Sequence, residues 1–169
     1  AALAGPSPVA TVPVLFSRER EGSTPLSLSI KLTNARCNLR CAYCYEAPYR
    51  DELSRRKLDV EAIIQQMHRE ANKVNPSSYA YLHGGEALLA PIDALERVLK
   101  EAYRLSGGAT GIQTNGTLIT DAHIELFKRY NTHVGISFDG PWPLNKARVP
   151  KDGGTKEASE RILKNIYRL

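Results

Sequence analysis

The sequence predicts an α/β fold with a parallel sheet, because strand-like and helix-like hydrophobic patterns alternate along most of its 169 residues. Its composition agrees, since 42% apolar and 24% charged residues are typical of an ordinary soluble globular protein. A third observation is that the polar and glycine-rich segments follow strands and precede helices. In a parallel sheet or barrel this places them at the edge where active sites form.

The chain is expected to begin with an extended lead-in and to continue as one domain. Residues 1–25 are rich in Ala, Pro, Ser and Thr, with residues 12–16 as one short edge strand. Residues 26–169 form the predicted domain, whose first strand is indicated by apolar residues that alternate with polar ones: Leu26, Leu28, Ile30 and Leu32.

Three more strands and four helices follow. The strands are predicted at residues 79–83, 111–114 and 134–138. Asn75-Pro76 should stop the first helix, whereas Thr120 and Thr155 should cap the third and fourth. The apolar residues that define the helices run from Val60 to Val74, Ile92 to Tyr103, Ile124 to Tyr130 and Ala158 to Ile166.

These elements make about four βα units, which predicts a partial TIM-type (β/α) barrel with right-handed crossovers. A full barrel of eight units takes about 250 residues, so we expect the chain to be the N-terminal part of a longer polypeptide. The last strand would otherwise leave an unpaired edge. Four segments should meet at the carboxyl edge of the sheet: Cys37 to Cys44, Gly84 to Glu86, Thr114 to Gly116 and Ser137 to Gly140.

The net charge, the hydrophobic pattern and the cysteine content indicate which partners and which cellular compartment to expect. The net charge of +5 suits an anionic partner, but acidic residues lie among the basic ones, which argues against nucleic acid. No apolar stretch reaches the roughly 18 residues of a membrane span, and the first residues do not form a secretory signal. All three cysteines lie close together, a poor disulfide framework. We therefore expect a cytoplasmic protein.

Cys37, Cys41 and Cys44 have the spacing C-x3-C-x2-C and follow the first strand. Thiolates select zinc, copper(I) or iron–sulfur clusters. Structural zinc takes four ligands, and although His68 or His83 could be the fourth, neither is near in sequence. A [4Fe–4S] cluster on three cysteines keeps one iron free to bind a substrate.

On this spacing the sequence resembles the radical S-adenosylmethionine (SAM) superfamily. The resemblance implies that Cys37, Cys41 and Cys44 bind a [4Fe–4S] cluster whose fourth iron takes the amino and carboxylate groups of SAM. It also implies reductive cleavage of SAM to a 5′-deoxyadenosyl radical that abstracts hydrogen from a substrate. Tyr43 matches the family position that contacts the adenine.

Three further segments resemble motifs of this family. Gly84-Gly85-Glu86 matches its GGE motif, which contacts the amino group of SAM, although Ala87 replaces the usual proline. Asn115 lies in a matching TNG segment, and Ser137 and Asp139 in a matching S-x-D-G-P segment, whose serine binds the carboxylate or ribose of SAM. Arg148 resembles an arginine that pairs with the carboxylate.

The sequence segments QTNG and SFDGP resemble those of one branch of the superfamily, the anaerobic sulfatase-maturase-like, SPASM-type enzymes. This implies a peptide or protein substrate and an electron donor such as flavodoxin or ferredoxin. Two other hypotheses stay open. One is a zinc-binding α/β module without redox chemistry that binds nucleic acid. The other is a remnant half-barrel that keeps the motifs without a complete active site.

Overall fold

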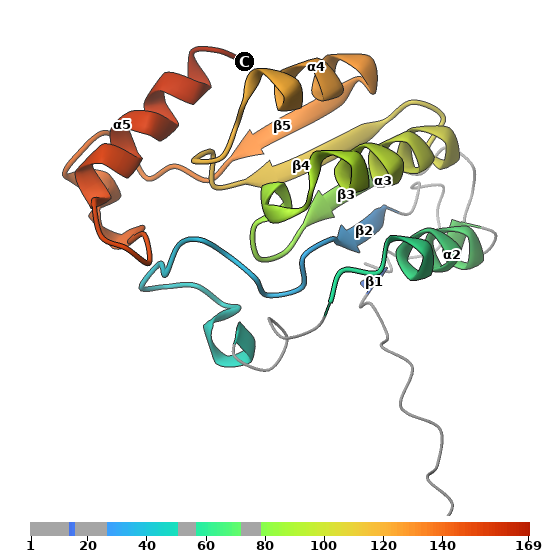
Figure 1. The fold of residues 1–169 in the computed structure, drawn as a ribbon, viewed down its shortest axis with the longest axis horizontal. Helices are drawn as coiled ribbons and strands as arrows, with labels where there is room; N and C mark the ends of the chain where they lie inside the picture. Colours follow the sequence, from blue (N-terminus) through green and yellow to red (C-terminus); the bar gives the residue numbers. More distant parts are fainter. Residues whose placement is uncertain (1–13, 16–26, 51–56, 72–78) are drawn as a thin grey trace, which may run out of the picture.

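The computed structural model describes residues 14–15, 27–50, 57–71 and 79–169 (Figure 1). Within them, one sheet has the strand order β1-β2-β3-β4-β5. β1 pairs antiparallel with β2, and every other neighbouring pair is parallel. The strands are β1 (Val14–Leu15), β2 (Leu28–Lys31), β3 (Ala80–His83), β4 (Thr110–Thr114) and β5 (Thr132–Ile136).

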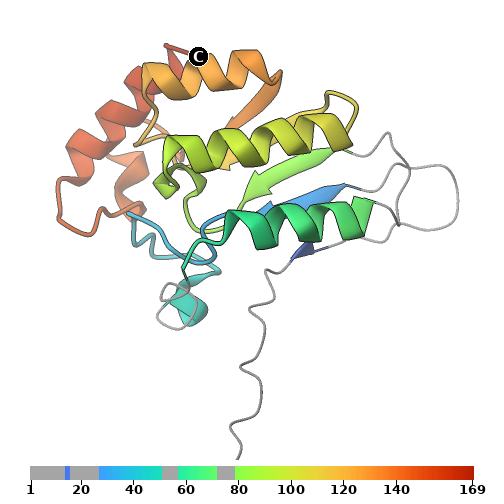
Figure 2. The ribbon, with the colours of Figure 1, turned by 45° about the vertical axis from the view of Figure 1, so that its right-hand side comes forward.

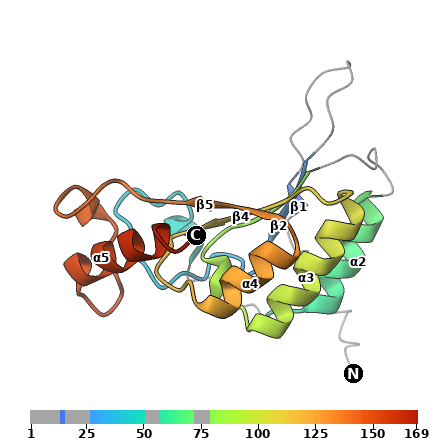
Figure 3. The ribbon, with the colours of Figure 1, turned by 90° about the horizontal axis from the view of Figure 1, so that it is seen from above.

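Helices follow the four parallel strands, as the alternating pattern predicts. Three of them, α2, α3 and α4, lie side by side along one face of the sheet (Figures 2 and 3). α5 lies apart from them, near the carboxyl ends of the strands. The helices are α2 (Val60–Ala71), α3 (Ile92–Leu105), α4 (Asp121–Arg129) and α5 (Thr155–Ile166), with short 3-10 turns η1 (Ala47–Tyr49), η2 (Ala87–Leu89) and η3 (Leu144–Ala147).

The hydrophobic core lies between the sheet and these helices. Ile30, Leu82 and Ile112 stand in register on three adjacent strands and are fully buried. Leu95 and Leu99 of α3 belong to the same buried cluster. Because strand side chains alternate between the two faces, the residues next to this row point to the opposite face. The core therefore leaves that face free for polar side chains.

The predicted fold class is confirmed. The edge strand expected at residues 12–16 is present as Val14–Leu15. The rest of the lead-in and the expected stop at Asn75-Pro76 lie outside the described residues. Among the described residues, no helix is long and apolar enough to cross a membrane.

One predicted helix cap is wrong, and another is confirmed. Thr155 is the first residue of α5 rather than its cap, because Gly154 takes the cap position in a left-handed conformation with φ +72°. Thr120 caps α4 as predicted, and its side chain accepts a hydrogen bond from the backbone N–H of His123. The cap of α5 thus depends on a backbone conformation that glycine adopts easily.

Candidate functional site

The three cysteines lie in the loop between β2 and η1 and line one cavity of about 210 Å³, here called the thiol cavity. All three are free and half-buried. The segment after β5 holds this loop in place: Arg40 N donates to Val149 O at 2.6 Å and Ala42 N to Ala147 O at 3.0 Å. The position of the thiols therefore depends on residues far later in the chain.

Hydrogen-bond donors lie near two of the sulfurs. Leu39 N lies 3.3 Å and Asn115 Nδ2 3.7 Å from Cys37 Sγ. Arg148 Nη1 lies 4.0 Å from Cys41 Sγ. Burial raises the pKa of both thiols, while the Arg148 guanidinium acts in the opposite direction at Cys41. The donors oppose this rise in part, which favours the thiolate, the form that binds metal, without reversing the shift.

The arrangement of the three thiols is compatible with an iron–sulfur cluster. Among the described residues, no three His, Cys, Asp or Glu side chains are grouped so that they could hold one metal ion. In an iron–sulfur cluster, each thiolate binds its own iron, so the sulfurs need not converge on one point. Three soft donors that line the same cavity satisfy that requirement.

Gly84 and Gly85 form the next part of the thiol cavity, at the end of β3. Both have positive φ, +83° and +50°. A Cβ on Gly85 would lie 2.1 Å from the carbonyl oxygen of Arg36, which also accepts a hydrogen bond from Glu86 N at 2.7 Å. The two glycines therefore let the end of β3 pass directly against the cysteine loop.

The Glu86 carboxylate does not line this cavity. It is fully buried and accepts hydrogen bonds from Leu88 N at 3.0 Å, Thr114 Oγ1 at 2.7 Å and Asn115 N at 2.7 Å. Burial raises the pKa of this carboxyl, and the three hydrogen bonds oppose that shift. Glu86 thus ties the carboxyl ends of β3 and β4 together.

Tyr43, Asp139 and Arg148 form a connected group at the cavity. The Tyr43 hydroxyl donates to Asp139 Oδ2, and Arg148 lies 3.0 Å from Oδ1 of the same carboxylate. The Arg148 guanidinium also lies over the Tyr43 ring, 5.4 Å from its centroid. Burial, followed by the hydrogen bond to Asp139, raises the pKa of Tyr43 to about 12. Tyr43 and Arg148 line the cavity, whereas Asp139 holds them from behind.

Ser137 and Asn115 line the cavity on the side of β4 and β5. Ser137 Oγ accepts from Gln113 Nε2 at 2.8 Å, and Gln113 Oε1 accepts from the Tyr81 hydroxyl at 2.7 Å. A Cβ on Gly135 would lie 2.4 Å from Gln113 Oε1, so this chain of hydrogen bonds requires glycine there.

Sequence reasoning missed a buried charged pair, of which Glu46 lines the same cavity. Lys31 donates to Glu46 Oε1, and both side chains are buried. Glu46 Oε2 has no hydrogen-bond partner among the described residues. His83, at the end of β3, also lines this cavity, and burial together with Lys31 lowers its pKa. A lysine at the end of an apolar strand was the available signal.

Comparisons with known proteins agree with this geometry. The family model of the radical SAM superfamily matches residues 32–169. A serine-type anaerobic sulfatase-maturating enzyme of Bacteroides thetaiotaomicron is 34% identical over 124 residues, which is 69% of this chain and 30% of the relative. A cysteine-type anaerobic sulfatase-maturating enzyme of Clostridium novyi is 33% identical over 155 residues, which is 83% of this chain and 39% of the relative.

Solved structures show the same likeness. Native anSMEcpe with bound AdoMet and Kp18Cys peptide superposes with a TM-score of 0.69 at 28% identity, covering 84% of this chain and 40% of that one. Native anSMEcpe with bound AdoMet and Cp18Cys peptide gives a TM-score of 0.67 at 27% identity, with 83% and 39% covered. The chain thus spans about a third of the length of the curated relatives that it matches.

Proposed function

Because the chain belongs to the radical SAM superfamily, whose enzymes use a [4Fe–4S] cluster and SAM, we propose that it provides the cluster and SAM site of a peptide-modifying enzyme. One observation carries the proposal: a single cavity is lined by Cys37, Cys41 and Cys44 together with the glycines and polar residues that the motifs identify. When bound, the cluster supplies the electron that cleaves SAM to the 5′-deoxyadenosyl radical, which takes a hydrogen from the substrate.

In this proposal each part of the thiol cavity holds a different part of SAM. The backbone of Gly84 and Gly85, which lines the cavity, accepts hydrogen bonds from its amino group. Arg148 and Ser137 bind its carboxylate, and the Tyr43 ring contacts the adenine. Asp139 positions Tyr43 and Arg148 without touching SAM, which agrees with its place outside the cavity lining.

The proposed substrate is a peptide or protein side chain. The relatives named above are sulfatase-maturating enzymes, and two related solved structures contain a bound peptide. The face of the sheet opposite the three helices carries Tyr81, Gln113 and Ser137 beside the cavity. We propose that the substrate side chain approaches SAM over this polar face.

The test is SAM cleavage by the protein after anaerobic reconstitution with iron and sulfide. We expect 5′-deoxyadenosine when dithionite supplies the electrons. Cys37→Ala, Cys41→Ala and Cys44→Ala should each lose most of the bound iron and form no 5′-deoxyadenosine. Ser137→Ala is the matched control, because it should keep its iron. Full iron content and SAM cleavage in all three cysteine variants would refute the proposal.

Absorption also separates this function from the zinc hypothesis. An iron–sulfur protein is brown and absorbs broadly at roughly 400 nm, because of charge transfer between sulfur and iron. A zinc protein is colourless. A colourless product with stoichiometric zinc would favour the zinc-binding module.

A further inference from the structure

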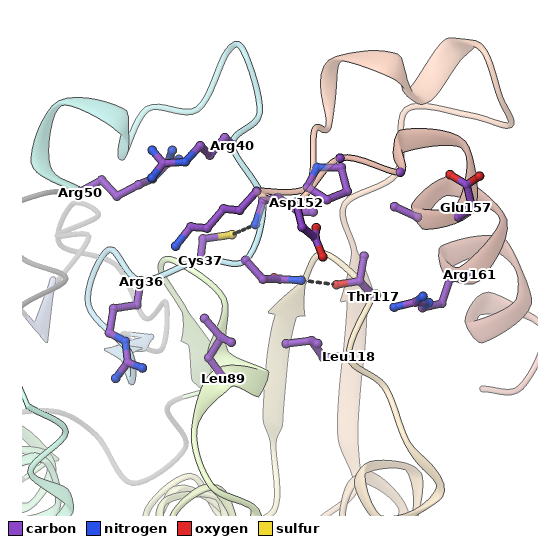
Figure 4. A pocket seen from close by; sticks show the side chains of 17 residues that line it. Arg36, Cys37, Arg40, Arg50, Leu89, Thr117, Leu118, Asp152, Glu157 and Arg161 are labelled. Atoms are coloured by element: carbon purple, nitrogen blue, oxygen red, sulfur yellow. Dashed lines mark hydrogen bonds between the residues drawn. The ribbon is translucent and has the colours of Figure 1, made fainter.

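A second cavity, of about 910 Å³, adjoins the thiol cavity (Figure 4). Both cavities are lined by Cys37 and Leu39 of the cysteine loop and by Arg50, which follows η1, so these residues separate the two cavities. Its other walls come from η2, the start of the loop after β4, and residues 150–161. We call it the basic cavity, because arginine and lysine side chains outnumber carboxylates in its lining.

Positive charge dominates the lining of this cavity. Asp152 and Glu157 are its two carboxylates. Its five cations share one property: among the described residues, none of them forms an ion pair. Elsewhere in the described chain, Arg97, Arg129 and Arg168 each pair with a carboxylate. The unpaired cations are Arg36, Arg40, Arg50, Lys151 and Arg161.

Two features distinguish the basic cavity from an ordinary solvated surface with positive charge. Arg50 is only 7% exposed, and its Nε has no hydrogen-bond partner among the described residues. A buried donor without a partner costs free energy, which a bound acceptor would recover. α5 also begins at this cavity, and its cap Gly154 provides no side-chain hydrogen bond. The uncapped N–H groups add further positive charge.

The arrangement of the cations fits a broad acidic face rather than one small anion. Figure 4 shows Arg40 and Arg50 extending toward one another on one side of the cavity, with Arg161 on the opposite side and Arg36 below. A single phosphate would need donors that converge on one point. Separate carboxylates on a protein surface would match cations placed around a rim.

We propose that the basic cavity is the docking surface for an acidic one-electron donor protein, such as a reduced flavodoxin or ferredoxin. This rests on the proposed function, since SAM cleavage needs one electron from outside. SAM fills the thiol cavity, whereas the basic cavity reaches the other side of Cys37. Electron transfer slows steeply with distance, so a donor must dock where the cluster ligands come nearest to the surface. The donor loses one electron and the cluster gains it. No bond is formed or broken in this step, and no proton is transferred.

The exposed cations Arg36, Arg40, Lys151 and Arg161 would steer and hold the donor. Encounters between redox proteins bury little surface, so charge has a large effect on their association rates. The effect should weaken as salt screens the charges.

The experiment compares Arg40→Glu and Arg161→Glu with the control Lys100→Glu in the reconstituted full-length protein. Lys100 is an exposed cation on α3, outside both cavities. Stopped-flow absorbance follows cluster reduction by reduced flavodoxin and, separately, by dithionite. Calorimetry measures the Kd for oxidised flavodoxin. At low salt we expect each cavity variant to be reduced by flavodoxin about tenfold more slowly and to bind it about tenfold more weakly.

Dithionite is small and needs no docking surface, so its rate should stay unchanged in all three variants. Unaltered flavodoxin kinetics in the cavity variants, or an equal loss in Lys100→Glu, would overturn the inference. If Arg40→Glu disturbs the cluster itself, the flavodoxin kinetics of Arg161→Gln test the inference instead, because Arg161 belongs to α5 and not to the cysteine loop. Wild-type protein that cleaves no SAM even with dithionite would instead refute the proposed function.

Discussion

Glu86 shows how a residue of a matched motif can be held by hydrogen bonds within the protein. Its carboxylate satisfies three donors from η2 and the end of β4, all of them buried. One of these is the backbone N–H of Asn115, whose side chain then reaches Cys37 Sγ and Asn38. Glu86 therefore positions the residues around the cysteine loop, while the glycines before it face the cavity.

Glu86→Gln should mainly lower stability, whereas Ser137→Ala should mainly weaken SAM binding. An amide has one acceptor oxygen, so Glu86→Gln leaves at least one buried N–H or O–H without an acceptor and should destabilise the protein by about 1–3 kcal/mol. Ser137→Ala should leave stability nearly unchanged but weaken SAM binding about tenfold. Urea unfolding and an anaerobic SAM titration measure the two effects. A Glu86→Gln variant with full stability and weak SAM binding would mean that the carboxylate reaches SAM directly.

Arg148 is the second residue whose neighbours define its role. Its guanidinium contacts the Asp139 carboxylate and lies over the Tyr43 ring, and its side chain is largely buried. A planar group with several fixed donors can hold Asp139 and still present donors to a carboxylate in the cavity. A lysine ammonium cannot do both.

Arg148→Lys should therefore weaken SAM binding by about tenfold to a hundredfold, since a charge-assisted hydrogen bond contributes about 1.5–3 kcal/mol. Bound iron should stay at the wild-type level. Tyr43→Phe is the matched control, because it removes the hydroxyl bonded to Asp139 but keeps the ring, and SAM affinity should change by less than about threefold. Equal SAM affinity in Arg148→Lys and wild type would exclude Arg148 as the carboxylate partner.

At the scale of elements, the start of α4 depends on a reciprocal cap. Thr120 Oγ1 accepts from His123 N at 3.4 Å, and Thr120 N donates to His123 Nδ1 at 3.2 Å. The second bond requires Nδ1 without a proton. Burial lowers the pKa of His123, so the folded state favours the neutral imidazole.

This cap predicts a stability that depends on pH. Because the pKa of His123 is lower in the folded than in the unfolded state, its contribution is complete above the unfolded value of about 6.5 and is lost as the pH falls below it. His123→Gln keeps an acceptor at the same position, so it should remove this part of the pH dependence. Urea unfolding between pH 8 and pH 5 tests the difference between the two proteins. Identical pH profiles would show that the imidazole does not titrate as the cap requires.

Thr120→Ala tests the other half of the cap. It should destabilise the protein by about 1 kcal/mol at pH 8, because one N–H of the first turn loses its acceptor. The same urea experiment measures it, with Thr155→Ala as control. Thr155 lies inside α5, so the control should cost less. A larger loss for Thr155→Ala would restore Thr155 as the cap of its helix.

At the scale of the whole molecule, the sheet has a free edge. Among the described residues, β5 pairs with β4 alone. Its side chains are half-buried or exposed, unlike those of β4, which are mostly buried. That residues 26–169 are the N-terminal part of a larger core domain remains a prediction. It requires a further strand or another segment to cover this edge of β5.

A polypeptide of these 169 residues should self-associate, because an open strand edge pairs with other copies. Adding a charge at the edge, His133→Lys, should shift it toward the monomer, whereas Gln65→Lys on the exposed side of α2 should not. Light scattering after gel filtration measures the mass. A monomer without either substitution would show that the edge is already protected.

The sequence by itself determined the order of elements, the fold class and the cysteine site, because these depend on local spacing. Hydrophobic periodicity and turn residues are properties of neighbouring positions. The motif residues could likewise be assigned to one edge of the sheet, since parallel strands present their carboxyl ends together.

Only the tertiary structure decided what each side chain does at that edge. It buried the Glu86 carboxylate, joined Asp139 to Tyr43 and Arg148, and paired Lys31 with Glu46, which lines the cavity. It also brought Arg36 and Arg161, which lie far apart in the chain, to one basic cavity. Which side chains share a space depends on how distant segments pack, and local spacing carries no information about that.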